Sequence, residues 1–220
     1  MDENTNDTNR LTQAKEAWAR EKRGLGGREV DDDAPDAARL PPGQHLVNTW
    51  PVLDLGRKPD IPLADWRLTI SGLVAHPTVW TWEQFLAQPQ CVQTSDFHCV
   101  TTWSTFDNRW EGLRFLDMMA AVVPLPAARY VFFTAYDDYT TNLPLTACTD
   151  DDVLLCRAWN GQPLTTAHGG PLRMIVPKRY AWKGAKWIKE IRFSEQDEKG
   201  FWEMRGYSNS AFPWQDDRYG

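Results

Sequence analysis

The chain has 220 residues, and its 24 basic and 30 acidic side chains leave a net charge of −6. This acidic balance excludes a general nucleic-acid binder, which needs a basic face for the phosphates. No apolar stretch approaches the length of about 18 residues that a membrane helix needs, so we expect no membrane span. The first ten residues lack the basic and apolar regions of a secretory signal, and the sequence therefore predicts a cytoplasmic protein.

Composition divides the chain near residue 40. Residues 1–39 are polar and charged, and we expect a flexible tail there. From Leu40 onward proline, tryptophan and alternating apolar residues predict one packed domain over 40–220. The four cysteines form no CxxC pair, and in this context they are expected to be thiols.

Hydrophobic periodicity predicts the first elements of this domain. Residues 66–71 alternate between apolar and polar side chains, which indicates a half-buried strand. Thr81 is a suitable N-cap for a short helix that includes residues 84–87. Apolar residues at i, i+3, i+4 and i+7 predict an amphipathic helix over 113–123. Its apolar stripe consists of Leu116, Met119, Ala120 and Val123.

Later runs of β-branched and aromatic residues, separated by proline and glycine, predict further strands. These runs are residues 129–136, 153–159, 172–176 and 187–193. Asn160-Gly161 lies between two of them and is typical of a hairpin turn. The fold class is therefore predicted to be α+β, rich in strands, with short helices and irregular loops.

The segment 97–104, with its unusual mixture of cysteine, histidine, threonine and tryptophan, is interpreted as a loop, as is 110–112. His98 and Cys99 are adjacent, so on a strand they would point to opposite faces and would not share one metal ion. A nucleophilic pair of Cys99 and His168 stays open, and so does a purely structural role for Cys99.

Residues 168–173 and 183–187 combine basic side chains with glycines that let backbone approach a ligand. Such a combination suits an anionic group such as a phosphate. The alternative is an ordinary solvated loop face.

Three blocks of the chain resemble one known family. They are Leu46–Val52, His98–Met118 with its Cys and its Trp-x-Gly, and His168–Phe193 with its His-Gly-x-Pro-x-Arg and Lys-Trp. Together they are similar to the sulfite-oxidase-fold molybdopterin oxidoreductases, and above all to the stand-alone bacterial sulfite oxidase-like proteins. The similarity runs from about Leu40 to Tyr219 in the same order. It implies a sulfite oxidase-like molybdopterin-binding fold.

The resemblance implies a role for particular residues. Cys99 matches the thiolate ligand of molybdenum, and a soft sulfur suits a metal that is also bound by a dithiolene. Tyr207 matches the tyrosine beside the metal's oxo group. The implied cofactor is molybdenum with molybdopterin, in the pyranopterin form without a mononucleotide. The residues that match its binding positions are Asn48, Thr134, His168, Arg173, Gly184, Ala185 and Lys186.

Departures from the family pattern concern the substrate. Sulfite oxidases have an arginine where this chain has Val47, and the methionine sulfoxide reductase branch has a glutamate where this chain has Thr101. Sulfite is therefore not the expected substrate unless another cation, from Arg109, Arg179 or Lys183, takes the place of the missing arginine.

The resemblance implies a two-electron oxygen-atom transfer on a small S-oxide, N-oxide or oxyanion. Cys99, Tyr207 and a cation (Arg109 or Lys183) would form the catalytic set, and an unidentified electron-transfer partner is implied. Two alternatives are a molybdopterin-binding subunit or carrier without turnover of its own, and a strand-rich interaction module.

Overall fold

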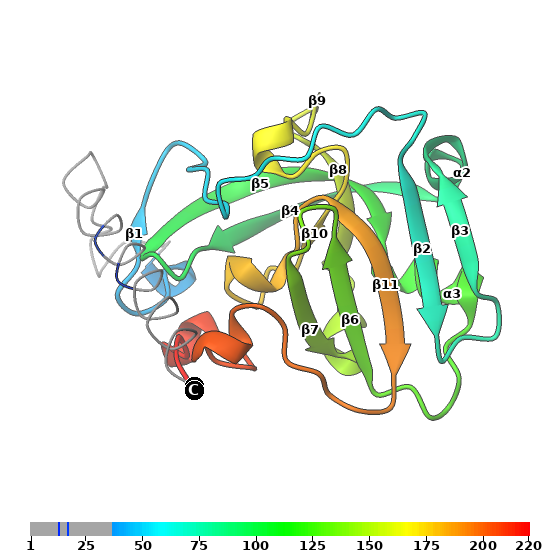
Figure 1. Ribbon diagram of the computed structural model, residues 1–220. Coiled ribbons are helices and arrows are strands. Elements are labelled where there is room, and N and C mark those ends of the chain that lie inside the picture. Colours follow the sequence, from blue (N-terminus) through cyan, green and yellow to red (C-terminus); the bar gives the residue numbers. More distant parts are fainter. Residues whose placement is uncertain (1–12, 14–16, 18–36) are drawn as a thin grey trace.

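The computed structural model describes residues 13, 17 and 37–220 (Figure 1). The predicted tail over 1–39 lies outside the described residues, apart from Gln13, Ala17 and a 3-10 turn over Ala37–Arg39. None of the helices in the described part of the chain is long and apolar enough to cross a membrane.

One sheet is built around a central long strand, β5. Its strands are β1 (His45–Leu46), β4 (Gln90–His98), β5 (Trp103–Arg114), β8 (Leu154–Trp159), β9 (Gln162–Pro163) and β10 (Arg173–Ile175). β5 pairs with β4 and β8 in antiparallel and with β1 in parallel orientation. The β8–β9 hairpin turns at Asn160 and Gly161, both with positive φ (50° and 80°), so the predicted hairpin turn is confirmed.

The other sheet has the order β3-β2-β11-β6-β7. Its strands are β2 (Arg67–Gly72), β3 (Thr78–Thr81), β6 (Tyr130–Ala135), β7 (Thr140–Pro144) and β11 (Ile188–Ser194). β2 and β11 run parallel, and the other pairs are antiparallel. In β2 the apolar residues Leu68 and Ile70 are buried, as the alternation predicts. All the strands predicted from sequence are present, with ends that differ by one or two residues.

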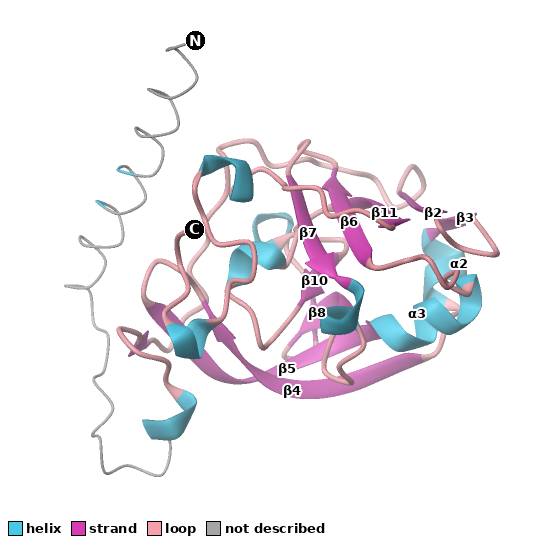
Figure 2. Cartoon of the chain, turned by 90° about the horizontal axis from the view of Figure 1, so that it is seen from below, coloured by secondary structure: helices cyan, strands magenta, loops and turns pink. Residues whose placement is uncertain are grey.

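The structure confirms the interpretation of 97–104 as a loop only for residues 99–102, which form the turn between β4 and β5, and corrects it for the other residues and for 110–112. Phe97 and His98 end β4, and residues 103–104 and 110–112 belong to β5. β5 is the only strand that pairs with β4, and much of one face of β4 is exposed. The sequence of β4 therefore lacks the alternation of apolar and polar residues that predicts a half-buried strand. Figure 2 shows β4 and β5 as a long curved hairpin beneath the other strands.

Two short α-helices lie at one end of the molecule, α2 (Trp82–Leu86) and α3 (Phe115–Val122) (Figure 2). The predicted N-cap of α2 is confirmed, since the Thr81 side chain accepts a hydrogen bond from Gln84 N–H and Thr81 N–H donates to Oε1 of Gln84. The apolar stripe predicted for α3 is wrong: the buried residues lie one position earlier in the sequence than the predicted ones.

The buried residues of α3 are Phe115, Met118 and Val122, while Val123 is 45% exposed. β5 continues to Arg114, so the chain enters the helix with Phe115 pointing inward. There its ring meets Phe133 and Phe193, with centroids 6.1 and 6.2 Å away. Tertiary contacts of the first residue therefore set the rotation of the helix.

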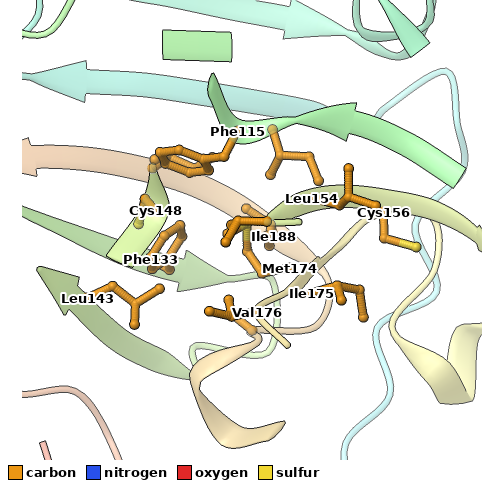
Figure 3. Packing of buried hydrophobic residues seen from close by; sticks show 14 of the residues in the cluster. Phe115, Phe133, Leu143, Cys148, Leu154, Cys156, Met174, Ile175, Val176 and Ile188 are labelled. Carbon is orange, nitrogen blue, oxygen red and sulfur yellow. The ribbon is translucent and has the colours of Figure 1, made fainter. Parts of the chain in front are cut away.

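Short 3-10 turns complete the described chain. They are Leu145–Cys148, Thr166–His168, Ala181–Lys183, Glu203–Arg205 and Pro213–Gln215. The core between the elements is apolar and includes two of the thiols, Cys148 and Cys156 (Figure 3). All four cysteines are free, as predicted, and burial raises the pKa of Cys156 to about 12.

Candidate active site

Cys99 lies in the tight turn between the two longest strands. The turn closes through hydrogen bonds from Cys99 N–H to the Trp103 carbonyl (2.9 Å) and from Thr102 N–H to the Cys99 carbonyl (3.0 Å). Thr102 has a φ of 73°, a left-handed conformation that lets the chain reverse here. Cys99 is 6% exposed, and its Sγ lies 3.1 Å from Oγ1 of Thr101.

A cavity of about 740 Å³, partly open to solvent, borders this turn. Its aromatic wall consists of Trp50, Phe97, Trp103, Tyr139, Trp182, Trp187 and Trp202. Its ionisable groups are Cys99, Asp54, Asp137, His168, Arg173 and Lys186. The other lining residues are Pro51, Leu53, Leu55, Val100, Ala181 and Gly184. The cavity therefore combines one thiol and several cations within an apolar enclosure.

Arg173, the first residue of β10, is 3% exposed. Its guanidinium donates to three backbone carbonyls: those of His168 (3.0 Å), Gly184 (3.3 Å) and Met174 (3.4 Å). It forms no ion pair with a carboxylate of the described residues. Burial lowers the pKa of Arg173 to about 10, a sign that its charge lacks a full counterpart.

Lys186 is a second cation whose hydrogen-bond acceptors within the described chain are all backbone carbonyl groups; its Nζ also lies 5.2 Å from the centroid of the Trp187 ring. Its Nζ donates to Leu53 (2.7 Å) and Ala167 (2.8 Å). Burial, together with the nearby Arg173, lowers the pKa of Lys186 to about 7. A bound anion would relieve the repulsion between the two cations and complete their hydrogen bonds.

His168 is neutral at pH 7, because burial lowers its pKa below the usual value of 6.5. Its ring stacks on Trp50 at 4.3 Å. Nε2 lies 3.0 Å from the Trp50 carbonyl, which can only accept, so Nε2 carries the proton. Nδ1, 3.0 Å from Thr165 Oγ1, is then the acceptor. The side chain thus ties the turn before β10 to the cavity wall.

Two glycines permit the close packing of these loops. A Cβ on Gly169, which has a φ of 98°, would lie 2.9 Å from Cβ and Cγ of Lys186. A Cβ on Gly184 would lie 2.6 Å from the Met174 carbonyl. The glycines of both basic segments therefore permit close packing of the two loops against each other, which brings Lys186 beside Arg173.

Comparison with known proteins identifies the family. The model of the oxidoreductase molybdopterin binding domain matches residues 55–202. The chain belongs to this family.

Individual relatives agree with the family match. The chain is 40% identical over 187 residues to a Bacillus subtilis (strain 168) protein named "Uncharacterized oxidoreductase YuiH", covering 83% of this chain and 93% of that one. It is 26% identical to the protein-methionine-sulfoxide reductase catalytic subunit MsrP of Campylobacter jejuni, covering 67% of this chain and 55% of the relative.

A solved structure supports the fold. The sulfane dehydrogenase SoxCD from Paracoccus pantotrophus matches with a TM-score of 0.59 at 22% identity, covering 63% of this chain and 40% of that one. The strand-rich α+β fold of the molybdopterin oxidoreductases is thereby confirmed, and this chain is a molybdopterin-dependent oxidoreductase.

The residues of the cavity fit the family's cofactor. Among the described residues that line the cavity, Cys99 is the only thiol, and a thiolate is a suitable ligand for molybdenum. Arg173 and Lys186 are buried or partly buried cations without a carboxylate partner in the described chain, which suits a phosphate. Trp103 lines the cavity, and its buried indole N–H has no acceptor among the described residues, so it is available to a bound group.

Several residues predicted for the site do not line the cavity. Asn48 is exposed, Thr134 lies on the face of β6 away from the core, and Ala185 is buried behind the cavity with its carbonyl accepting from Met174 N–H. Arg109 is exposed and pairs with Glu111. Tyr207 packs behind the wall, with its ring centroid 5.3 Å from that of Trp182 and 4.9 Å from that of Trp202.

Lys183 is fully buried away from the cavity. Its Nζ forms an ion pair with Glu203 (2.7 Å) and donates to both oxygens of Asn142. Burial lowers the pKa of Lys183, and Glu203 opposes this shift. The Glu203 carboxylate also accepts from Trp182 Nε1 (3.2 Å), so this pair supports the cavity wall rather than facing it.

Sequence reasoning missed the aromatic wall and the two carboxylates of the cavity. Trp50, Trp182 and Trp202 have no pattern that separates them from the other tryptophans of the chain. Asp137 lies two residues after the end of β6, and burial raises the pKa of its carboxyl group. Its place at the end of a predicted strand was the signal that would have found it.

Proposed function

We propose that the cavity binds molybdopterin, with Cys99 as the protein ligand of molybdenum and with Arg173 and Lys186 on the phosphate. One observation supports this most strongly: the thiol and both cations border the same cavity, although they are 74 and 87 residues apart in sequence. Within the described chain both cations hydrogen-bond only to backbone carbonyl groups and form no ion pair, so an anion would complete their charge pairing.

When bound, the cofactor would supply two-electron redox chemistry at molybdenum, including oxygen-atom transfer. The protein's own residues would bind and orient it. Cys99 would act as a deprotonated ligand, Arg173 as a planar fork and Lys186 as a point charge. Neutral His168 would hold the preceding turn against Trp50, and the aromatic wall would limit the access of water.

The charges of the cavity favour a neutral substrate. His168, Arg173 and Lys186 are its only basic side chains in the described structure, and two of them are taken up by the phosphate in this proposal. Sulfite oxidases have an arginine where this chain has Val47. None of the three cations that could take its place lines the cavity: Arg109, Arg179 and Lys183. The wall is mostly aromatic. These features support small S-oxides or N-oxides with apolar substituents as substrates, ahead of sulfite.

Metal analysis tests the proposal most directly. The chain is produced in a host that synthesises molybdopterin, and we expect about one molybdenum per chain. Cys99→Ser should keep the fold but lose the thiolate-to-metal absorption and turnover. Cys156→Ser is the matched control, because that thiol is buried outside the cavity lining. Full activity in Cys99→Ser would refute the assignment.

Turnover with dye electron carriers separates the enzyme from the alternative. Reduction of neutral S- or N-oxides by the molybdenum-loaded protein supports catalysis by the chain itself. A stoichiometric content of molybdenum without turnover on any of them would instead favour a cofactor-binding subunit. Nucleotide released on acid denaturation would contradict the mononucleotide-free form of the cofactor that we propose.

A further inference from the structure

Two segments outside the family-matched range contact the turn that holds Cys99. One precedes that range, at residues 42–45, and the other follows it, at Arg218. Between them they donate hydrogen bonds to three carbonyl groups of the turn, those of Cys99, Val100 and Thr102. The turn is therefore held from outside as well as by its own hairpin.

Gln44 provides the first contact. It is 9% exposed, and its Nε2 donates to the Cys99 carbonyl at 3.1 Å. Its Oε1 accepts from Ser104 Oγ (3.3 Å), which in turn lies 2.8 Å from Nδ1 of His98. The neighbouring His45 N–H donates to the Thr102 carbonyl at 2.9 Å. One buried side chain thus connects the turn with the ends of both β4 and β5.

Arg218 provides the second contact, from the C-terminal segment (red in Figure 1). Its side chain is 12% exposed, and its Nη1 donates to the Val100 carbonyl. Nη2 donates to the Pro42 carbonyl (3.4 Å), and Nε pairs with the Asp216 carboxylate (2.5 Å). The guanidinium therefore joins the Cys99 turn to the segment that carries Gln44.

We propose that Gln44 and Arg218 are positioning residues that hold the Cys99 thiol in the orientation its ligand role requires. That Cys99 is a metal ligand rests on the proposed function. That hydrogen bonds from Gln44 and Arg218 restrain its turn does not. A metal ligand must be held within about 0.5 Å of its productive position, and the hairpin's own hydrogen bonds leave the carbonyl groups of Val100 and Thr102 to be bound from outside. Hydrogen bonds to the carbonyl groups of the turn supply this restraint.

Alkylation of the cofactor-free protein measures this restraint without any metal. Iodoacetamide is added to folded protein, and modification of each cysteine is followed by mass spectrometry. Gln44→Ala and Arg218→Ala should each raise the rate at Cys99 about 2- to 12-fold, the range expected for one lost hydrogen bond. Gln44→Glu keeps the shape but loses the donor, so it should behave like Gln44→Ala.

Matched controls separate a local effect from general loosening. Gln90→Ala removes a glutamine that donates to the Phe85 carbonyl, and Arg205→Ala removes an arginine that donates to the Phe201 carbonyl. Neither contacts the Cys99 turn, and neither should change the rate at Cys99. Cys148 and Cys156, both fully buried, report global opening within the same sample.

Each outcome supports or overturns the proposal. Faster modification confined to Cys99 supports it, and equal acceleration at Cys148 and Cys156, or no change at Cys99, overturns it. If Arg218→Ala does not fold, Arg218→Lys and the two Gln44 variants carry the test. In metal-loaded protein the same variants should shift the thiolate-to-metal absorption. Retention of that band in Cys99→Ser would refute the proposed function, while the alkylation result would still decide the positioning role.

Discussion

Replacing Lys186 by methionine should stabilise the cofactor-free protein and at the same time impair its binding of the cofactor. Lys186 is partly buried, forms no ion pair in the described chain and lies near Arg173, while Asp54 opposes the lowering of its pKa only in part. Methionine keeps most of the length of the side chain and removes the charge. The expected gain arises because a buried cation without a counterion is costly until an anion binds.

The magnitude follows from the pKa. Burial and the repulsion from Arg173 lower the pKa of Lys186 from 10.5 to about 7. At 1.36 kcal/mol per unit this shift corresponds to at most roughly 5 kcal/mol, which partial exposure reduces. The variant also loses two hydrogen bonds to carbonyl groups, worth about 1 kcal/mol each. A net gain of about 2 kcal/mol remains, equivalent to a rise in Tm of about 4–8 °C.

The gain should depend on pH in a defined direction. Between pH 7 and 10.5 the unfolded chain binds a proton at Lys186 that the folded chain does not hold. The parent protein therefore gains stability from this group as the pH rises through that window. The advantage of Lys186→Met should be largest at or below pH 7 and should disappear toward pH 10.5.

Urea unfolding of cofactor-free protein at pH 7 and pH 9.5 measures both effects. Lys183→Met is the matched control, since Lys183 is also buried but pairs with Glu203 at 2.7 Å. Its loss leaves a buried carboxylate unpaired and should destabilise by about 3–5 kcal/mol. Lower stability of Lys186→Met at pH 7, or a gain that does not change with pH, would refute the reasoning.

Three further outcomes are expected. In urea unfolding, Phe115→Ala should lower the free energy of unfolding by about 3–5 kcal/mol, and Leu116→Ala by clearly less. Equal losses would contradict the observed buried face of α3. Gly184→Ala should lower the free energy of unfolding by about 1–3 kcal/mol and lower the molybdenum content, because the new Cβ would approach the Met174 carbonyl. An unchanged molybdenum content would show that the loop can move without affecting cofactor binding. With dye carriers, sulfite should have a kcat/KM well below about 10⁶ M⁻¹s⁻¹, and a higher value would identify a cation that the cavity lining does not include.

If Arg173 and Lys186 bind the phosphate as proposed, cofactor binding should also depend on pH. Because the pKa of Lys186 is about 7, binding of a phosphate above this pH requires uptake of a proton at Nζ. Cofactor loading should therefore weaken as the pH rises above 7. Inorganic phosphate, titrated against the cofactor-free protein, would report the same trend.

Local patterns determined much of this protein. The alternation in β2, the capping box at Thr81 and the Asn160-Gly161 turn depend on neighbouring residues, so they can be predicted from sequence. The resemblance to the molybdopterin oxidoreductases was carried by short blocks in the same way. Five of its implied residues line the cavity: Cys99, His168, Arg173, Gly184 and Lys186.

Only the tertiary structure decided which side chains share the cavity. Lys186 reaches the Leu53 carbonyl across 133 residues of sequence, whereas Lys183, three residues earlier, turns away to Glu203. Composition and spacing contain no signal for this difference, because both lysines lie in the same basic segment; the resemblance assigned Lys186 to the cofactor but also placed Lys183 in the catalytic set. The hydrogen-bond partner of each lysine and its burial depend on contacts between segments that are distant in sequence. Such contacts also set the rotation of α3 and bring together the aromatic wall of the cavity. A periodicity read along the chain describes neighbours in sequence, while the site is made of neighbours in space.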